Sequence, residues 1–128
     1  MAGVGHAGLN LRAGSLTSVE LTQAALDSIE RLNPALNAFV AVDAEVSLAQ
    51  ARKADELFAQ GLDLGPLHGI PVAVKDNIDT ADHVTTYGSA HFAGMRPARD
   101  ALCVQRLREA GAVIVGKTLT HEFAYGPT

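Results

Sequence analysis

The sequence has very little cysteine, and it has no apolar run long enough to cross a membrane. Cys103 is the single cysteine among 128 residues, so it can neither cross-link the chain nor belong to a local metal-binding pair. Because Cys103 stands beside Leu102 and Val104 in a helix-like stretch, we expect it to be a small buried hydrophobic residue. A membrane helix needs about 20 apolar residues, so we expect no membrane partner.

The charge pattern also narrows the class of protein. Ten Lys and Arg and fourteen Asp and Glu give a net charge of -4, and the two signs are mixed along the chain rather than gathered in blocks. This pattern argues against nucleic-acid binding. Residues 1–16 lack the basic start and apolar segment of an export signal, so we predict a cytoplasmic location. At 48% hydrophobic and 19% charged, the composition is that of one soluble globular unit.

Neither a metal motif nor a hydrolase nucleophile is visible. The five histidines are His6, His68, His83, His91 and His121. They show no paired spacing on a common helix, so we predict no metal and no cofactor. The five serines are Ser15, Ser18, Ser28, Ser47 and Ser89. None lies in a glycine-flanked strand-to-helix elbow, and Ser89, in the most plausible loop, is better interpreted as a turn residue.

The first half of the chain has a helical pattern. Residues 1–15 are rich in Gly and Ala without a clear period, so we expect a loose segment. Thr17 and Glu20 have the spacing of a capping box, which predicts a helix over 18–32 that stops at Asn33-Pro34. The short apolar stretch 36–42 is ambiguous. A second helix is predicted over 43–60, with Gly61 as its stop.

The second half has an α/β pattern. A buried strand is predicted over 70–75, and a functional loop follows over 76–98. A third helix over 101–110, with Asp100 as its cap, leads to a strand over 112–115. We predict an α/β fold in which helices pack on an incomplete mixed or parallel sheet. Exposed edges of such a sheet would favour self-association.

Lys75 is the best candidate for chemistry because it ends the predicted strand and begins the polar loop. An amine held against apolar walls loses its proton more readily than one in water, and can then act as a base. The plainer alternative is a strand-end lysine whose head reaches water. Asp76 could orient the amine or bind loop amides, and the second role is favoured. The neighbouring pairs Asp76/Asp79 and His121/Glu122 are better interpreted as loop-ordering or solvated groups.

A nucleotide-binding pattern appears at Gly111–Thr118, where a glycine, four residues and Gly-Lys-Thr follow one another. A phosphate-binding loop needs a preceding strand and small residues between its glycines. Here a helix-like segment precedes Gly111, and the residues between the glycines are typical of a strand. Nucleotide binding is therefore the weaker interpretation.

Five blocks of sequence closely resemble the N-terminal part of the amidase signature family, in order and in approximate spacing. The blocks are GPLHGIPVAVKDNIDT (65–80), TTYGS (85–89), RLREAGA (106–112), GKT (116–118) and EFAYG (122–126). The resemblance implies a partial amidase domain over 16–128 and the family's layered fold. It also implies hydrolysis of carboxamide C–N bonds by a nucleophilic serine, a bridging serine in a cis peptide, and a lysine that matches Lys75.

The family's two serines and its oxyanion donors lie in segments downstream of these blocks. The resemblance therefore implies an N-terminal portion that acts on a small-molecule amide only within a complete enzyme and is inactive alone. Whether that enzyme is a hydrolase or an amidotransferase stays open, as does the amide it uses. An alternative is a non-catalytic fragment or subunit that completes its core with a partner.

Overall fold

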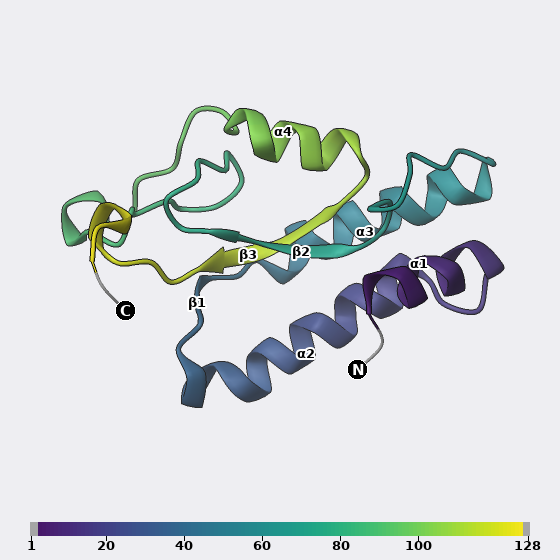
Figure 1. Ribbon diagram of the computed structural model, residues 1–128, viewed down its shortest axis with the longest axis horizontal. Coiled ribbons are helices and arrows are strands. Elements are labelled where there is room, and N and C mark those ends of the chain that lie inside the picture. The colour runs from purple at the N-terminus through teal and green to yellow at the C-terminus, as the bar shows by residue number, and fades with distance from the viewer. Residues whose placement is uncertain (1–2, 127–128) are drawn as a thin grey trace.

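A small mixed sheet organises the residues that the computed structural model describes, which are 3–126 (Figure 1). The α-helices are α1 (Val4–Ala13), α2 (Ser18–Leu36), α3 (Ala44–Ala59) and α4 (Leu102–Glu109). The strands are β1 (Phe39–Ala41), β2 (Pro71–Lys75) and β3 (Val113–Thr118). Two short 3-10 helices, η1 (Ala90–Phe92) and η2 (Glu122–Ala124), complete this part of the chain. The predicted α/β class is confirmed.

The strand order in the sheet is β1-β3-β2. The central strand β3 is parallel to β2, with Val74 opposite Lys117 and Lys75 opposite Thr118. The predicted parallel pair is therefore confirmed. The ambiguous stretch 36–42 contains β1, which pairs antiparallel with the end of β3 and makes the sheet mixed.

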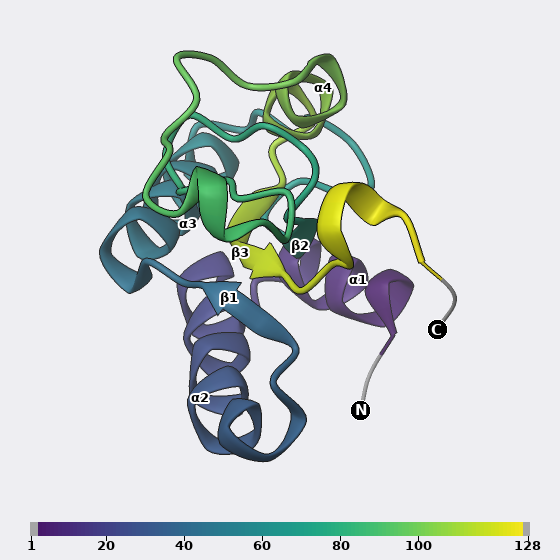
Figure 2. The ribbon, with the colours of Figure 1, turned by 90° about the vertical axis from the view of Figure 1, so that its left-hand side faces the viewer.

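Helices and the long loop cover the sheet on both faces (Figures 1 and 2). On the face of α4, a core cluster contains Val74, Val104 and Ile114. On the face of α2 and α3, a second cluster contains Ala51, Val113 and Val115. Successive residues of a strand point to opposite faces, so β3 contributes to both clusters. The crossover from β2 to β3 runs through the loop and α4, which places that loop at the carboxyl end of β2.

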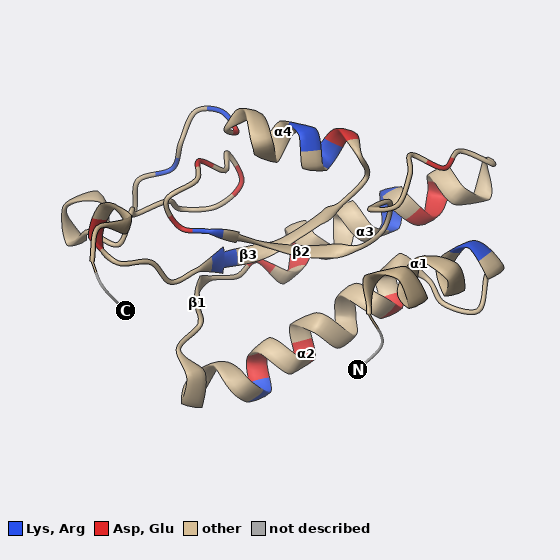
Figure 3. Cartoon of the chain, in the orientation of Figure 1, with Lys and Arg blue, Asp and Glu red and all other residues tan. Residues whose placement is uncertain are grey.

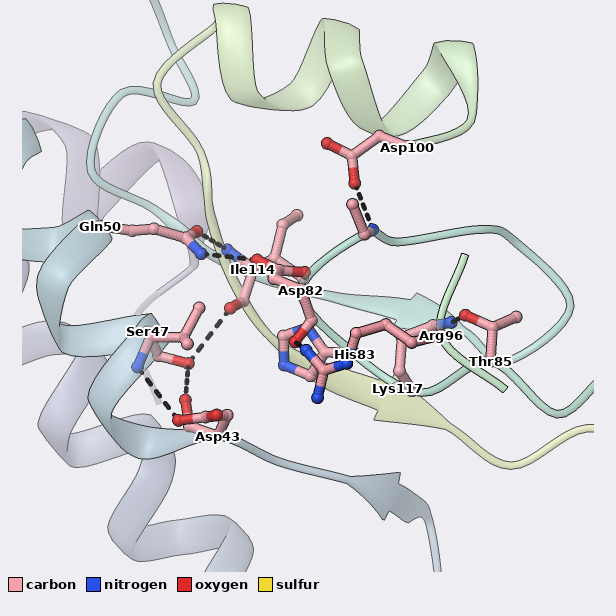
Figure 4. Close-up of polar contacts among 12 residues, drawn as sticks. Asp43, Ser47, Gln50, Asp82, His83, Thr85, Arg96, Asp100, Ile114 and Lys117 are labelled. Carbon is pink, nitrogen blue, oxygen red and sulfur yellow. Dashed lines mark hydrogen bonds and ion pairs between the residues drawn. The ribbon is translucent and has the colours of Figure 1, made fainter. Parts of the chain in front are cut away.

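Helix α3 closes the edge of β3 that β1 does not reach. The side chain of Gln50 accepts a hydrogen bond from the Ile114 N–H at 2.9 Å, and the Ser47 hydroxyl donates to the Ile114 carbonyl at 3.2 Å (Figure 4). These two side chains take the place of a neighbouring strand for one residue. The backbone groups of a buried strand are thereby satisfied without a longer β1.

The N-terminal segment differs from its prediction. Instead of a loose stretch over 1–15, the described residues of that segment contain α1, and residues 1–2 lie outside the described range. Ala7 and Leu11 on one side of α1 pack against Ile70. Arg12 is held to Asp63 at 2.7 Å. Ala7, Gly8 and Leu11 form the buried face of α1, whereas Val4 and Leu9 are exposed, so a small face holds this helix on the rest of the molecule.

The second helix starts as predicted and continues further than predicted. The Thr17 and Glu20 capping box is present, but α2 passes through Pro34 to Leu36. A proline this near a helix end removes only its own backbone donor. The Asn33 side chain binds both backbone groups of Phe39, at 2.8 and 2.9 Å. These two hydrogen bonds fix the turn into β1. Because α2 runs to Leu36, the helix stop expected at Asn33-Pro34 is wrong.

The third predicted helix is shifted in its cap and in its buried face. Asp100 does not cap α4, because Ala101 occupies that position and the Asp100 carboxylate accepts a hydrogen bond from the Ala81 N–H at 2.8 Å. Cys103 is exposed, and the neighbouring Val104 is fully buried instead. The expectation that Cys103 is a buried hydrophobic residue is therefore wrong. The packing of α4 on the sheet determines that Val104, rather than Cys103, faces the core.

Candidate functional site

Lys75 lies where the sequence places it, at the last residue of β2. Its side chain is exposed and lines an open hollow of about 200 Å³ together with Leu119, Thr120 and His121. Within residues 3–126, its amine makes no hydrogen bond or ion pair. The apolar walls expected around this amine are not supplied by the described residues. The arrangement leaves the amine free to meet another molecule or another part of a protein.

Asp76 is the first residue of the loop, and it is buried, with 1% of its surface exposed. Its carboxylate accepts hydrogen bonds from the Thr86 N–H at 3.2 Å and the Thr86 hydroxyl at 2.5 Å. Its backbone N–H donates to the Thr118 carbonyl, and its carbonyl accepts from the Tyr87 N–H, both at 2.9 Å. Of the two roles considered for Asp76, the ordering of the loop is confirmed.

Basic residues stand at the ends of both β2 and β3 (Figure 3). The basic residue on β3 is Lys117, a second amine, which lies opposite Val74. It is fully buried. Its Nζ donates to the Ile78 carbonyl at 2.8 Å and to the Thr85 hydroxyl at 2.6 Å, and lies 3.2 Å from Oδ1 of Asp76. Burial lowers the pKa of Lys117 below its ordinary value, and the Asp76 carboxylate opposes this effect.

Sequence reasoning missed the importance of Lys117 because it considered this residue only within the nucleotide-binding pattern. The structure places Val113–Thr118 in β3, so the residues between the two glycines form a strand rather than a phosphate-binding loop. A signal was nevertheless present. A lysine that continues an apolar run such as Val113–Val115 must find an acidic partner if it is buried, and Asp76 stands at the equivalent end of the other strand.

The segment that follows β3 also forms hydrogen bonds with the loop. The Ser89 hydroxyl donates to the Glu122 carboxylate at 2.6 Å, and the Phe123 N–H donates to the Tyr87 carbonyl at 2.7 Å. The Tyr87 hydroxyl donates to Asp79 at 2.5 Å, and this hydrogen bond raises the pKa of Tyr87. Ser89 and Glu122 therefore join two segments beside the hollow, as loop-ordering groups.

A charged cluster around Asp82 joins the loop to α4. Figure 4 shows Asp82 and His83 of this cluster. Asp82 contacts the buried His83 at 2.7 Å and Arg108 at 2.7 Å, and Arg108 also binds Asp100 at 2.8 Å. Burial alone would raise the pKa of Asp82, but His83 and Arg108 outweigh it and lower that pKa to about 2. Asp82 is thus an ionised structural anchor.

Two further observations concern metal ions and membranes. Over residues 3–126, no three His, Cys, Asp or Glu side chains gather in an arrangement that could hold a metal ion. Along the same stretch, none of the helices has the length and apolar character needed to cross a membrane. The predicted absence of a metal and of a cofactor stays a prediction.

The described residues thus form an α/β layer with an exposed lysine at the end of β2 and a buried polar network around Asp76 and Lys117. Comparison with known proteins identifies the family. The family model named Amidase matches residues 20–128. The chain belongs to the amidase signature family.

Several relatives show how much of the family's domain these residues represent. The chain is 49% identical over 116 residues to the A-type subunit of the glutamyl-tRNA(Gln) amidotransferase of Chloroflexus aurantiacus, covering 91% of this chain and 24% of that protein. For the corresponding protein of Carboxydothermus hydrogenoformans the identity is 45%, with the same shares. The peptide amidase of Stenotrophomonas maltophilia has the same fold with a TM-score of 0.89 and 41% identity, over 94% of this chain and 25% of the enzyme. The chain therefore spans about a quarter of the length of the relatives it matches.

Proposed function

We propose that this chain supplies the lysine of an amide-cleaving centre, and that Lys75 is the group that accepts and returns the proton. The observation that carries the proposal is the position of Lys75 within the family's most specific sequence block, at the end of β2 on an open hollow. An exposed amine without internal partners is free to contact a nucleophile. Lys117, in contrast, is buried and donates hydrogen bonds to two loop residues, so it is not available to a nucleophile.

The chemistry follows from the family's serine, bridging serine and lysine. A neutral Lys75 takes a proton through the bridging hydroxyl while the nucleophilic serine forms a bond to the amide carbon. The carbon–nitrogen bond then breaks, and the proton held by Lys75 passes to the leaving nitrogen. Water releases the acyl group in a second round of the same steps. None of the five serines of this sequence lies in the family's serine-rich signature, so both hydroxyls come from outside these 128 residues.

Two amide classes have specific support. The likeness to a peptide amidase structure favours a carboxamide that is simply hydrolysed. The 49% identity to an A-type amidotransferase protein favours transfer of the amide nitrogen to an acceptor. Both reactions begin with the same cleavage of a carbon–nitrogen bond, so the role proposed for Lys75 is common to them. Discrimination requires an assay of each substrate class.

A chimeric enzyme provides the sharpest test. The segment of the Stenotrophomonas maltophilia peptide amidase that superposes on this chain would be replaced by residues of this chain, giving a complete domain. We expect the chimera to release ammonia from a peptide amide, and Lys75→Ala to lower kcat at least about 1,000-fold. Lys53→Ala, at an exposed site on α3, is the matched control. A folded chimera whose turnover survives Lys75→Ala would refute the proposal.

The isolated chain provides a complementary test. We expect no measurable turnover of simple amides or glutamine by the purified 128-residue chain, because the nucleophile and the bridging hydroxyl are missing. Robust turnover that depends on Lys75 would overturn this expectation. Size-exclusion chromatography of the same sample addresses the alternative of a non-catalytic fragment. In that experiment, a compact monomer that binds no hydrophobic dye would count against a chain that completes its core with a partner or with a second copy.

A further inference from the structure

We propose that Lys117 is a positioning residue for Lys75, acting through Asp76 and the first ten residues of the loop. The proposal rests on the function proposed for Lys75. Lys117 lies beneath the loop, where it cannot meet a substrate, because its side chain is fully buried. Its effect on the reaction would come through the backbone that carries Lys75.

The directions of the hydrogen bonds support this role. The Lys117 ammonium donates hydrogen bonds to the Ile78 carbonyl and the Thr85 hydroxyl, and its third contact is an ion pair with the Asp76 carboxylate. All three belong to residues 76–85, the segment that begins directly after Lys75. The Lys117 amine therefore contacts residues at both ends of the segment 76–85.

The strand register explains how the contacts of Lys117 can influence the position of Lys75. Val74 lies opposite Lys117, and Lys75 lies opposite Thr118. Side chains alternate between the faces of a sheet, so Lys117 points to the face of the loop while Lys75 points to the other. Asp76 continues the pairing, since its N–H donates to the Thr118 carbonyl at 2.9 Å. Fixing Asp76 therefore fixes the last peptide of β2, from which Lys75 projects.

Because Asp76 and Lys117 are both buried, loss of either charge would be costly for the fold. The two residues are 1% and 0% exposed. Loss of the ammonium would leave a buried carboxylate oxygen, Oδ1 of Asp76, without a compensating charge, and movement of the loop toward water would relieve this cost. Movement of Asp76 would carry Lys75 with it. A displacement of about 1 Å of a catalytic group is enough to lower a rate about 100-fold.

Hydrogen exchange in the 128-residue chain tests the positioning step without any assay of activity. We expect Lys117→Met, which keeps the volume and removes the donors, to speed exchange of the amides of residues 76–86 at least about tenfold, since these amides depend on the held loop. The amides of α2 serve as the internal reference. Equal protection of residues 76–86 in both chains, or a uniform loss across the whole molecule, would overturn the proposal.

Kinetics in the chimera test the functional step. We expect Lys117→Met to lower kcat about 10- to 100-fold with KM within about threefold. The double variant Lys117→Met/Asp76→Asn removes the uncompensated charge, so its melting temperature should recover while kcat stays low. Unchanged kcat in folded Lys117→Met, or recovery of kcat together with the melting temperature, would overturn the proposal. Turnover that survives Lys75→Ala would instead refute the proposed function alone, while the exchange result still decides the positioning step.

Discussion

The Nζ atom of Lys117 lies 3.2 Å from Oδ1 of Asp76 inside the molecule. Lys117 is near the end of β3, and Asp76 directly follows the parallel strand β2. Immediately beside them, Lys75 is exposed on the opposite face of the sheet. The carboxyl edge of the sheet thus holds two amines in contrasting environments. The buried amine donates two hydrogen bonds to loop residues and forms an ion pair with Asp76, and the exposed amine has no partner within residues 3–126. This contrast supports a structural role for Lys117 and the catalytic role proposed for Lys75.

The contrast predicts very different effects of two matched substitutions on stability. Lys75→Met removes no hydrogen bond or ion pair found among the described residues, so we expect the free energy of unfolding to change by less than about 0.5 kcal/mol. Lys117→Met breaks a buried pair, and we expect it to cost about 3–5 kcal/mol. Urea denaturation followed by circular dichroism measures both changes. Equal destabilisation by the two variants would contradict the assignment.

Asp82 should make the stability of the fold depend on acid. Its pKa is lowered from 3.8 to about 2 in the folded chain, chiefly by His83 and Arg108 acting against burial. A lowered carboxyl pKa stabilises the fold above the unfolded value and loses that contribution as the pH falls from about 4 to about 2. We therefore expect Asp82→Asn to cost about 2 kcal/mol at pH 7 and much less at pH 2.

Denaturation of Asp82→Asn at several pH values would check this prediction. Glu30→Gln changes the net charge equally at a position on α2 outside this charged cluster, so it is the matched control. The control should show no such convergence with the parent chain in acid. A difference between Asp82→Asn and the parent that stays constant from pH 7 to pH 2 would show that the ionised carboxylate contributes nothing.

Local signals in the sequence predicted several elements well. The capping box of Thr17 and Glu20, the helix expected to start near Asp43 and the β2–loop junction at Lys75 each depend on residues within a few positions of one another. Short-range hydrogen bonds and side-chain periodicity determine such features. The family resemblance then identified the fold. The catalytic role of Lys75 stays a proposal.

Features set by distant contacts were missed. Strand β1 has three residues and exists because β3, far along the sequence, pairs with it. The buried role of Lys117 depends on Asp76, which is distant in sequence and adjacent in space. Each of these depends on a pairing that periodicity in one segment cannot reveal.

The thiol of Cys103 provides a simple check on the phase of α4. Because Cys103 is exposed, we expect a thiol reagent such as dithionitrobenzoate to label the folded chain nearly as fast as the chain in denaturant. The neighbouring buried position offers the matched control, since a cysteine introduced by Val104→Cys, in a chain that also carries Cys103→Ser, should be labelled slowly. Protection of Cys103 in the folded chain would show that α4 is rotated.

Gly88 joins the loop to the segment that lines the Lys75 hollow. Its φ is +72°, and a Cβ there would lie 2.7 Å from the Thr120 carbonyl oxygen and 2.8 Å from that of His121. Gly94 in the same loop has a φ of +82° with no atom within 4 Å of an added Cβ. Alanine at either position costs the strain of a left-handed backbone, about 1–2 kcal/mol.

Only Gly88→Ala adds a clash with backbone that cannot move aside, so we expect it to be more destabilising than Gly94→Ala by about 1–3 kcal/mol. Urea denaturation of the two variants measures this difference. In the chimeric enzyme, Gly88→Ala should also lower kcat, because Thr120 and His121 line the hollow with Lys75. Equal stability of the two variants, with equal kcat, would show that the loop and the segment after β3 are not in contact at Gly88.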